Sequence, residues 1–331
     1  MKDRCVGGEV RLDLNESPLP PPRTILEAAC GELGRINRYP DPEEYRELEY
    51  LLAEYSGVPE GYVAVFNGGD EALNTLFAVF TAKRIKTVSI PRYSFTMYRV
   101  LAESWGVRLE LLSMRDDGEW WSLDLPPSSA SGEAVIIDSP NNPTGSPLLD
   151  EADAVEALER GKILVVDEAY YEFSGRSLAG LAEAYSNIII LRTLSKAFAL
   201  AGLRIGYMIA RPETLDRLNA RVLPFPISRV SLAIAREALK GRAYIREIVK
   251  MVEEARPLYR KALEKAGFKT YNSRTNFVLA RAPSSEVVEA VENGCVRIRR
   301  TDIGPEWVRV TIAGVRELEV LRKALEGATL D

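Results

Sequence analysis

The chain has 331 residues, 46% of them hydrophobic, and a net charge of −5 at pH 7. This length predicts a large core and about two domains, and the acidic balance gives no sign of nucleic-acid binding. The sequence contains no histidine, which excludes Ser-His-Asp and Cys-His catalysis and His-ligated zinc, so a general base must be lysine, tyrosine or carboxylate.

Short apolar runs alternate with amphipathic stretches of helical periodicity from about residue 60 to residue 210. Most of the runs are continuous and β-branched, which is typical of strands buried on both faces of a parallel sheet. The predicted strands are 62–66, 87–90, 108–112, 134–138, 163–167, 187–191 and 205–210. The pattern predicts an α/β domain over residues 31–224, with a mostly parallel seven-stranded sheet and ligand loops at the carboxyl ends of its strands.

The pattern changes after Pro224. A helix-rich stretch over 231–266 leads into shorter strand-like runs, and an amphipathic helix over 317–326 follows them. The strand-like runs are 276–280, 296–299 and 308–312. We expect a smaller α+β domain of residues 225–331, on which a proline-rich N-terminal arm of residues 1–30 packs.

No segment approaches the roughly 18 consecutive apolar residues of a membrane span, and the first nine residues lack the apolar core of a signal peptide. Cys5, Cys30 and Cys295 are few, odd in number and far apart, so we expect reduced thiols in a cytoplasmic protein. The sequence also lacks glutamine, which fits either a thermophilic source or a drift in base composition.

Two neighbouring strand ends carry reactive side chains. Lys196 follows the apolar run 187–191 beside Thr193 and Ser195, and Arg204 lies eight residues further on. Asp167 ends the apolar run before it, where a carboxylate is costly to bury unless it is paired. A lysine that can form an imine, an acid that can hold a pyridinium, and an arginine near hydroxyl groups are the parts of a pyridoxal-phosphate site. The alternative for Asp167 is an N-cap of the next helix.

Two strand-end turns add to this set. The turn Asn67-Gly-Gly-Asp70 follows a strand and opens a helix, where glycines let backbone amides approach an anion and the helix N-terminus favours a phosphate. A plain strand-to-helix turn looks the same, but beside the lysine segment the turn predicts a phosphate-binding cup. Asn142, in a second turn, can donate a hydrogen bond to the phenolic oxygen of the cofactor.

The chain resembles fold-type I, pyridoxal-phosphate-dependent aminotransferases, and among them the histidinol-phosphate aminotransferase family. The resemblance implies the α/β fold of that type, with a large and a small domain. The matching segments occur in the family's order and span nearly the whole chain. They are 14–18, 38–42, 67–71, 141–145, 167–173, 192–207, 275–279 and 308–311.

The resemblance implies a catalytic set of three residues. Lys196 bonds covalently to the cofactor and carries the proton, Asp167 pairs with the pyridine nitrogen, and Tyr170 hydrogen-bonds the phenolic oxygen together with Asn142. Phe95 stacks on the ring; the family often has tyrosine there, and Tyr93 is the other candidate.

The cofactor phosphate is implied to bind to the amides of Gly69 and Asp70 and to the side chains of Thr193, Ser195 and Arg204.

Further residues are implied to bind across a subunit boundary or to the substrate. Tyr39 reaches the cofactor phosphate of a neighbouring subunit, which implies a homodimer with shared active sites. Asn15, Arg299 and Arg309 are implied to bind substrate, with Arg309 as the fork that holds an α-carboxylate. Arg299, with Arg297 and Arg300, is either a contact for a substrate phosphate or part of an exposed basic strand.

The reaction implied is transamination between histidinol phosphate and 2-oxoglutarate, giving imidazole acetol phosphate and glutamate for histidine biosynthesis, without a metal. An aromatic or aspartate aminotransferase, a threonine-phosphate decarboxylase of cobalamin synthesis, and an inactive scaffold are the alternatives. One departure from the family is Ala199, where the family usually has glycine.

Overall fold

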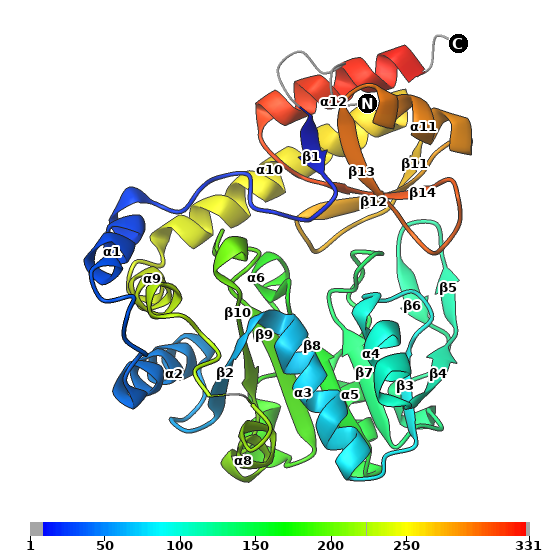
Figure 1. The fold of residues 1–331 in the computed structure, drawn as a ribbon. Helices are drawn as coiled ribbons and strands as arrows, with labels where there is room; N and C mark the ends of the chain where they lie inside the picture. The colour runs from blue at the N-terminus through cyan, green and yellow to red at the C-terminus, as the bar shows by residue number, and fades with distance from the viewer. Residues whose placement is uncertain (1–8, 223, 329–331) are drawn as a thin grey trace.

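The computed structural model describes residues 9–222 and 224–328 (Figure 1). A seven-stranded sheet with its helices forms the lower part of the molecule in this view, and a five-stranded sheet with its own helices forms the upper part. The long helix α10 (Ala243–Lys265) runs from one part to the other.

The large sheet contains all seven predicted strands, and their ends differ from the prediction by at most two residues. Its order is β2 (Val63–Asn67), β10 (Ile205–Ile209), β9 (Ile188–Thr193), β8 (Ile163–Asp167), β7 (Ala134–Asp138), β3 (Thr87–Pro91) and β4 (Arg108–Leu112). Only β10 is antiparallel to its neighbours, β2 and β9, and the strands from β9 to β4 are parallel. The prediction of a mostly parallel sheet is confirmed.

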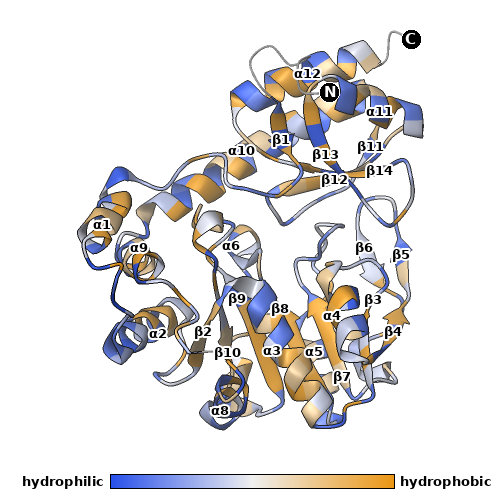
Figure 2. Cartoon of the chain, in the orientation of Figure 1, coloured by the Kyte–Doolittle hydropathy of each residue, from blue (hydrophilic) through white to orange (hydrophobic). Residues whose placement is uncertain are grey.

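Both faces of this sheet are covered, which explains why its strands are continuously apolar. Alternate residues of β7 point into opposite cores: Val135 and Ile137 join one cluster, and Ala134 and Ile136 the other. Figure 2 shows the strands of the sheet as mainly hydrophobic. The helices around the sheet are α2 (Pro42–Ser56), α3 (Gly68–Ala82), α4 (Met97–Trp105), α5 (Glu151–Glu159), α6 (Tyr171–Ser174), α7 (Leu181–Ala184) and α8 (Pro212–Asn219). Because the strands from β9 to β4 are parallel, their carboxyl ends lie at the same edge of the sheet. The polar residues predicted for the site lie at or near this edge.

The small sheet has the order β1 (Val10–Leu12), β13 (Val296–Arg300), β14 (Trp307–Thr311), β12 (Phe277–Arg281) and β11 (Lys269–Thr270). It packs with α10, α11 (Ser285–Asn293) and α12 (Val315–Ala328). A hairpin of β5 (Met114–Asp116) and β6 (Trp121–Leu123) stands apart. The predicted helix-rich stretch is two helices, α9 (Arg229–Lys240) and α10, with Gly241 as the C-cap of α9.

The N-terminal arm enters both parts. Its strand β1 pairs in parallel with β13, and its helix α1 (Arg23–Leu33) packs on α9. The domain boundaries at residues 30 and 224 stay predictions, and α1 runs through the first of them.

The cysteines differ from expectation. Cys295 is disulfide-bonded, so the prediction of reduced thiols is wrong for this residue, while Cys30 is a free, exposed thiol. Cys5 lies outside the described residues. Sequence alone cannot reveal such a bond, because it depends on which residues the fold brings together.

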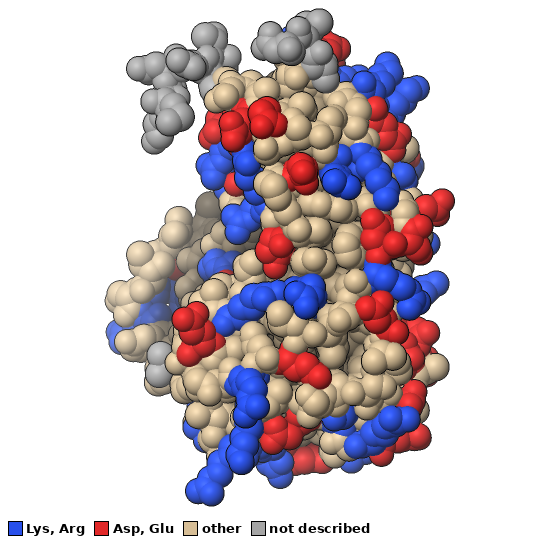
Figure 3. Space-filling model, turned by 90° about the vertical axis from the view of Figure 1, so that its right-hand side faces the viewer, with Lys and Arg blue, Asp and Glu red and all other residues tan. Residues whose placement is uncertain are grey.

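The surface carries charges of both signs. On the face shown in Figure 3, lysine and arginine side chains are interspersed with aspartate and glutamate. Within residues 9–222 and 224–328, none of the helices combines the length and the apolar composition of a membrane span.

Candidate active site

A cavity of about 330 Å³ lies at the carboxyl ends of β7, β8 and β9, and the N-terminal arm, β13 and β14 also contribute to its lining. Every predicted site residue except Tyr39 lines it. These residues are Asn15, Gly69, Asp70, Phe95, Asn142, Asp167, Tyr170, Thr193, Ser195, Lys196, Arg204, Arg299 and Arg309. The fold thus brings segments together that are up to 294 positions apart in the chain, as Asn15 and Arg309 are.

Lys196 follows β9 and points into the cavity, where its Nζ donates a hydrogen bond to the carbonyl oxygen of Leu14 at 3.1 Å. Burial, and next the positive charge of Arg309, lower the pKa of Lys196 to about 8. A lysine with such a pKa is partly neutral near pH 7 and can act as a nucleophile.

Asp167 is buried at the end of β8, with a donor on each carboxylate oxygen. Tyr98 OH donates to its Oδ2 at 2.7 Å, and the amide of Ala169 donates to its Oδ1 at 3.0 Å. Burial raises its pKa to about 6. Helix α6 begins only at Tyr171, with Tyr170 as its N-cap, so the alternative role of Asp167 as a helix cap is wrong. A cation placed against this carboxylate would relieve the cost of its burial.

A second buried carboxylate, Asp138, was missed by sequence reasoning. It lies on β7 opposite Asp167 in register and also lines the cavity. It accepts hydrogen bonds from Asn141 Nδ2 at 2.8 Å and from the amide of Asn142 at 2.9 Å. Burial raises its pKa to about 7, and the charge of Asp167 adds to the effect. The signal was available, because both acids end apolar strands.

Four polar side chains from separate segments of the chain line the cavity together with the two acids. Asn15 Nδ2 donates to Tyr170 OH at 2.8 Å, which leaves the hydroxyl proton of Tyr170 free to donate elsewhere. Arg309 donates to Asn142 Oδ1, so the amide group of Asn142 is oriented with its NH₂ group available. Two donors are thus ready for one acceptor such as a phenolic oxygen.

Several hydrogen-bond donors that could bind an anion lie at the N-terminus of α3. Gly69 and Asp70 lie in its first turn, Thr193 Oγ1 donates to Ser195 Oγ at 2.9 Å, and Arg204 pairs with Asp70 at 2.8 Å. Exposed amides, hydroxyl groups and a guanidinium at a helix N-terminus suit a phosphate.

Glycines let these elements approach closely. Gly68 has φ +77°, and a Cβ there would come within 2.6 Å of Arg204 Nη2. A Cβ on Gly206 would come within 2.5 Å of the Gly68 carbonyl carbon. Both positions therefore require glycine if α3 is to begin against β10 and beside Arg204.

Of the two candidates for the stacking residue, Phe95 lines the cavity. It packs edge-on against Tyr98, with ring centroids 5.7 Å apart. Tyr93 instead contacts Trp121 at 5.4 Å and lies outside the cavity lining. The geometry therefore favours Phe95 over Tyr93 as the stacking residue.

Two arginines of the cavity lack an acidic partner among the described residues. Arg309 is buried, its pKa is lowered by that burial, and its Nε has no hydrogen-bond partner. Arg299 forms no ion pair, whereas Arg297 pairs with Asp13 at 3.1 Å and Arg300 with Glu292 at 2.8 Å. Guanidinium groups that line a cavity without an acidic partner indicate a binding site for an anionic ligand.

Tyr39 is 74% exposed and lies outside the cavity of its own chain. Its ring stacks on Phe225, with centroids 4.4 Å apart.

The cavity fits pyridoxal phosphate group by group. Asp167 suits a protonated ring nitrogen, Tyr170 and Asn142 suit the phenolic oxygen, and Lys196 suits the aldehyde. The hydrogen-bond donors at the start of α3 suit the phosphate.

Comparison with known proteins agrees with this fit. Residues 8–326 match the family described as aminotransferase class I and II. The histidinol-phosphate aminotransferase of Sulfurisphaera tokodaii is 37% identical over 322 residues, covering 96% of this chain and 89% of the relative. That of Thermococcus kodakarensis is 35% identical over 327 residues, covering 98% and 94%. The structure resembles the histidinol-phosphate aminotransferase of Sinorhizobium meliloti in complex with pyridoxal-5'-phosphate, with a TM-score of 0.87, 25% identity and coverage of 97% and 91%.

Proposed function

Because the chain belongs to the class I and II aminotransferase family, whose cofactor is pyridoxal phosphate, we propose that it transfers the amino group of histidinol phosphate to 2-oxoglutarate. The products are imidazole acetol phosphate and glutamate, a step of histidine biosynthesis. The relatives named histidinol-phosphate aminotransferase are similar to this chain over nearly their whole length, which supports this substrate.

One observation carries the proposal: Arg309 and Arg299 are guanidinium groups without acidic partners in the described chain, and both line the cavity that contains Lys196. Arg309 is buried, and because burying a charge without an ionic partner is costly, an anionic substrate offsets that cost. Arg299 is an exposed residue of the cavity lining and adds a second positive charge there. Guanidinium forks fit carboxylates and phosphates alike. We infer that Arg309 binds the α-carboxylate of glutamate and, with Arg299, the phosphate of histidinol phosphate.

The other residues of the cavity have distinct tasks. The bound cofactor supplies an aldehyde for the amino group and an electron-withdrawing ring. Lys196 holds and moves the proton at the substrate carbon, since the chain has no histidine to do so. Asp167 keeps the ring nitrogen protonated, and Tyr98 fixes the orientation of that carboxylate.

We further propose a two-fold homodimer with shared sites, in which Tyr39 contacts the cofactor phosphate of the partner subunit. Its support is the position of Tyr39, exposed and outside its own cavity, in a stretch whose Leu33 and Ile36 are also 56% and 67% exposed. We also propose a cytoplasmic location. Disulfides occur inside hyperthermophiles, which reconciles Cys295 with that location.

Two substitutions test the shared use of the arginines. Arg309→Lys keeps the charge but loses the fork, so both half-reactions, with histidinol phosphate and with glutamate, should slow by about tenfold or more. Arg299→Ala should slow the histidinol phosphate half-reaction selectively, and Arg297→Ala, whose side chain pairs with Asp13, is the matched control. Unchanged rates in the Arg309→Lys enzyme would overturn the assignment.

A further inference from the structure

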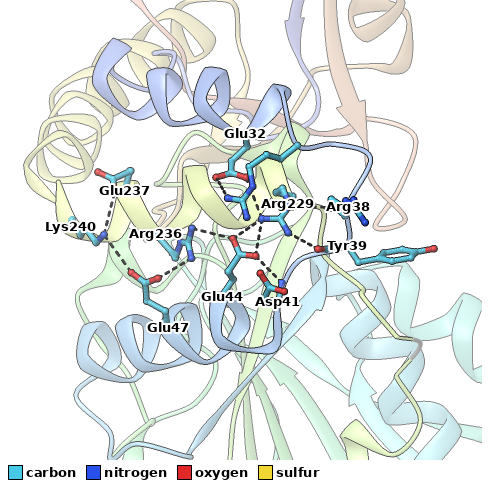
Figure 4. A network of polar contacts seen from close by, with 11 residues as sticks. Glu32, Arg38, Tyr39, Asp41, Glu44, Glu47, Arg229, Arg236, Glu237 and Lys240 are labelled. Carbon is cyan, nitrogen blue, oxygen red and sulfur yellow. Dashed lines mark hydrogen bonds and ion pairs between the residues drawn. The ribbon is translucent and has the colours of Figure 1, made fainter.

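Arg229 is the first residue of α9, and its guanidinium is the centre of a buried polar network (Figure 4). Its side chain is only 3% exposed. Nη1 pairs with Glu32 at 3.3 Å and with Glu44 at 2.9 Å. Nε donates to the carbonyl oxygen of Arg38 at 3.4 Å, and Nη2 donates to that of Tyr39. One side chain thus links α1, α2 and the loop between them.

Neither helix formation nor burial favours a cation at this position. The N-terminus of a helix carries partial positive charge, which disfavours a cation, and burial of a guanidinium is costly unless all its donors are used. The contacts that the guanidinium makes must therefore offset the cost of placing it here. Two of its acceptors are backbone carbonyls of consecutive residues, 38 and 39, so the network fixes the path of the backbone in this loop.

The fixed loop presents an exposed aromatic ring. In Figure 4 the side chain of Tyr39 points away from the network, and it is 74% exposed. Its ring stacks on Phe225, four residues before Arg229, at 4.4 Å. Both the backbone and the ring of Tyr39 are thus held in place although the chain buries little of the side chain. A preorganised tyrosine is an effective anchor for a second molecule, because little entropy is lost on binding.

We propose that Arg229 is a positioning residue that acts on the cofactor site of a second copy of this chain by holding Tyr39. This inference rests on the proposed dimer with shared sites. Arg229 lies outside the cavity lining of its own chain, so we expect it to act on the cofactor site of the second copy, through Tyr39, and not on the cofactor site of its own chain.

The same helix offers a matched control in Arg236. Arg236 also pairs with Glu44, at 3.7 Å, and with Glu47 at 2.9 Å. The structure gives it no contact with the carbonyls of residues 38 and 39. Arg236→Gln therefore removes part of the same ionic network without releasing the Tyr39 loop.

Hybrid dimers with two affinity tags separate effects within a chain from effects across the subunit boundary. In the first hybrid, one chain carries Lys196→Ala and the other Arg229→Gln. Its only intact Lys196 receives Tyr39 from a chain with an intact Arg229. In the second hybrid, one chain carries both substitutions and the other is wild type, so the intact site receives Tyr39 from a chain that lacks Arg229. The visible absorbance of lysine-bound cofactor reports only the intact site, and titration with pyridoxal phosphate gives its affinity.

We expect wild-type cofactor affinity in the first hybrid and about tenfold weaker affinity in the second, the size of one lost hydrogen bond to a charged group. Arg229→Lys, which keeps the charge without the fork, should give the same asymmetry, and Arg236→Gln should give none. Equal affinities in the two hybrids, whether both reduced or both normal, overturn the inference. The same pair of hybrids made with Tyr39→Phe tests the shared site itself. If cofactor affinity differs between the two hybrids with Tyr39→Phe but not with Arg229→Gln, the role of Arg229 is refuted and the shared site stands. If affinity is equal in the two hybrids with either substitution, the shared site is refuted.

Discussion

The Asp167 carboxylate shows how single residues set the chemistry of this cavity. It is buried, has two donors, and its pKa is raised to about 6 in the chain without cofactor. A cationic ring nitrogen stabilises its ionised form. We predict that Asp167→Asn folds but binds pyridoxal phosphate more weakly by ~1–3 kcal/mol. Tyr98→Phe, which removes one donor, should weaken binding by about 1 kcal/mol. Cofactor titration followed by absorbance measures both, and wild-type affinity in Asp167→Asn would refute the pairing.

Lys196 should capture the cofactor in a pH-dependent way. Burial lowers its pKa to about 8, and only the neutral amine attacks an aldehyde. As pH rises through about 8, the neutral fraction grows and then levels off, so the rate of cofactor capture should rise and then reach a plateau. Stopped-flow absorbance after mixing with pyridoxal phosphate measures this rate, and a midpoint above pH 10 would show that the cavity leaves the lysine unperturbed.

Sequence reasoning identified the residues that carry reactive groups at strand ends, and missed those that act through tertiary contacts. Asp167 ends an apolar strand and Lys196 closely follows one, which is visible in the sequence. Tyr98 lies inside α4, and only the packing of that helix brings its hydroxyl to Asp167. Arg229 was missed for the same reason, since its partners lie about 190 positions away.

Elements were predictable where the pattern is long and self-contained. The strands of the large sheet are continuous β-branched runs, so each was found from its own residues. Strand β1 was not, because it has three residues and exists by pairing with β13. The split of the predicted helical stretch at Gly241 likewise depends on where α9 packs.

The turn after Lys196 stores a small backbone strain. Ala199 has φ +57°, a left-handed conformation that costs an alanine roughly 1–2 kcal/mol and a glycine almost nothing. The glycine that is usual in the family is therefore explained. Glycine relieves this strain, and its greater entropy in the unfolded chain offsets part of the gain, so we predict that Ala199→Gly raises the free energy of unfolding by a net of about 0.5–1 kcal/mol. Chemical denaturation measures it, Ala197→Gly serves as the control, and a loss of stability in Ala199→Gly would contradict the prediction.

At the scale of the whole molecule, buried carboxylates should make the cofactor-free protein less stable at higher pH. Burial raises the pKa of Asp138 to about 7 and that of Glu172 to about 8, above their values in an unfolded chain. Between about pH 4 and pH 8 the folded chain binds more protons than the unfolded chain, so stability falls as pH rises. Asp138→Asn should reduce the loss in the free energy of unfolding across this pH range by on the order of 2 kcal/mol. Unfolding curves across this pH range measure it, and equal slopes in both proteins would contradict it.

The two parts of the molecule and the N-terminal arm together build one cavity, which holds a nucleophilic lysine, a buried acid and two guanidinium groups without acidic partners among the described residues. The central claim is that this cavity accepts the amino group of histidinol phosphate. A single-turnover reaction of the cofactor-loaded enzyme with histidinol phosphate, without any 2-oxo acid, tests it most directly. We predict complete loss of the visible band of lysine-bound cofactor, and its return when 2-oxoglutarate is added. An unchanged band with histidinol phosphate, together with conversion by aspartate or an aromatic amino acid or release of carbon dioxide from threonine phosphate, would contradict the claim.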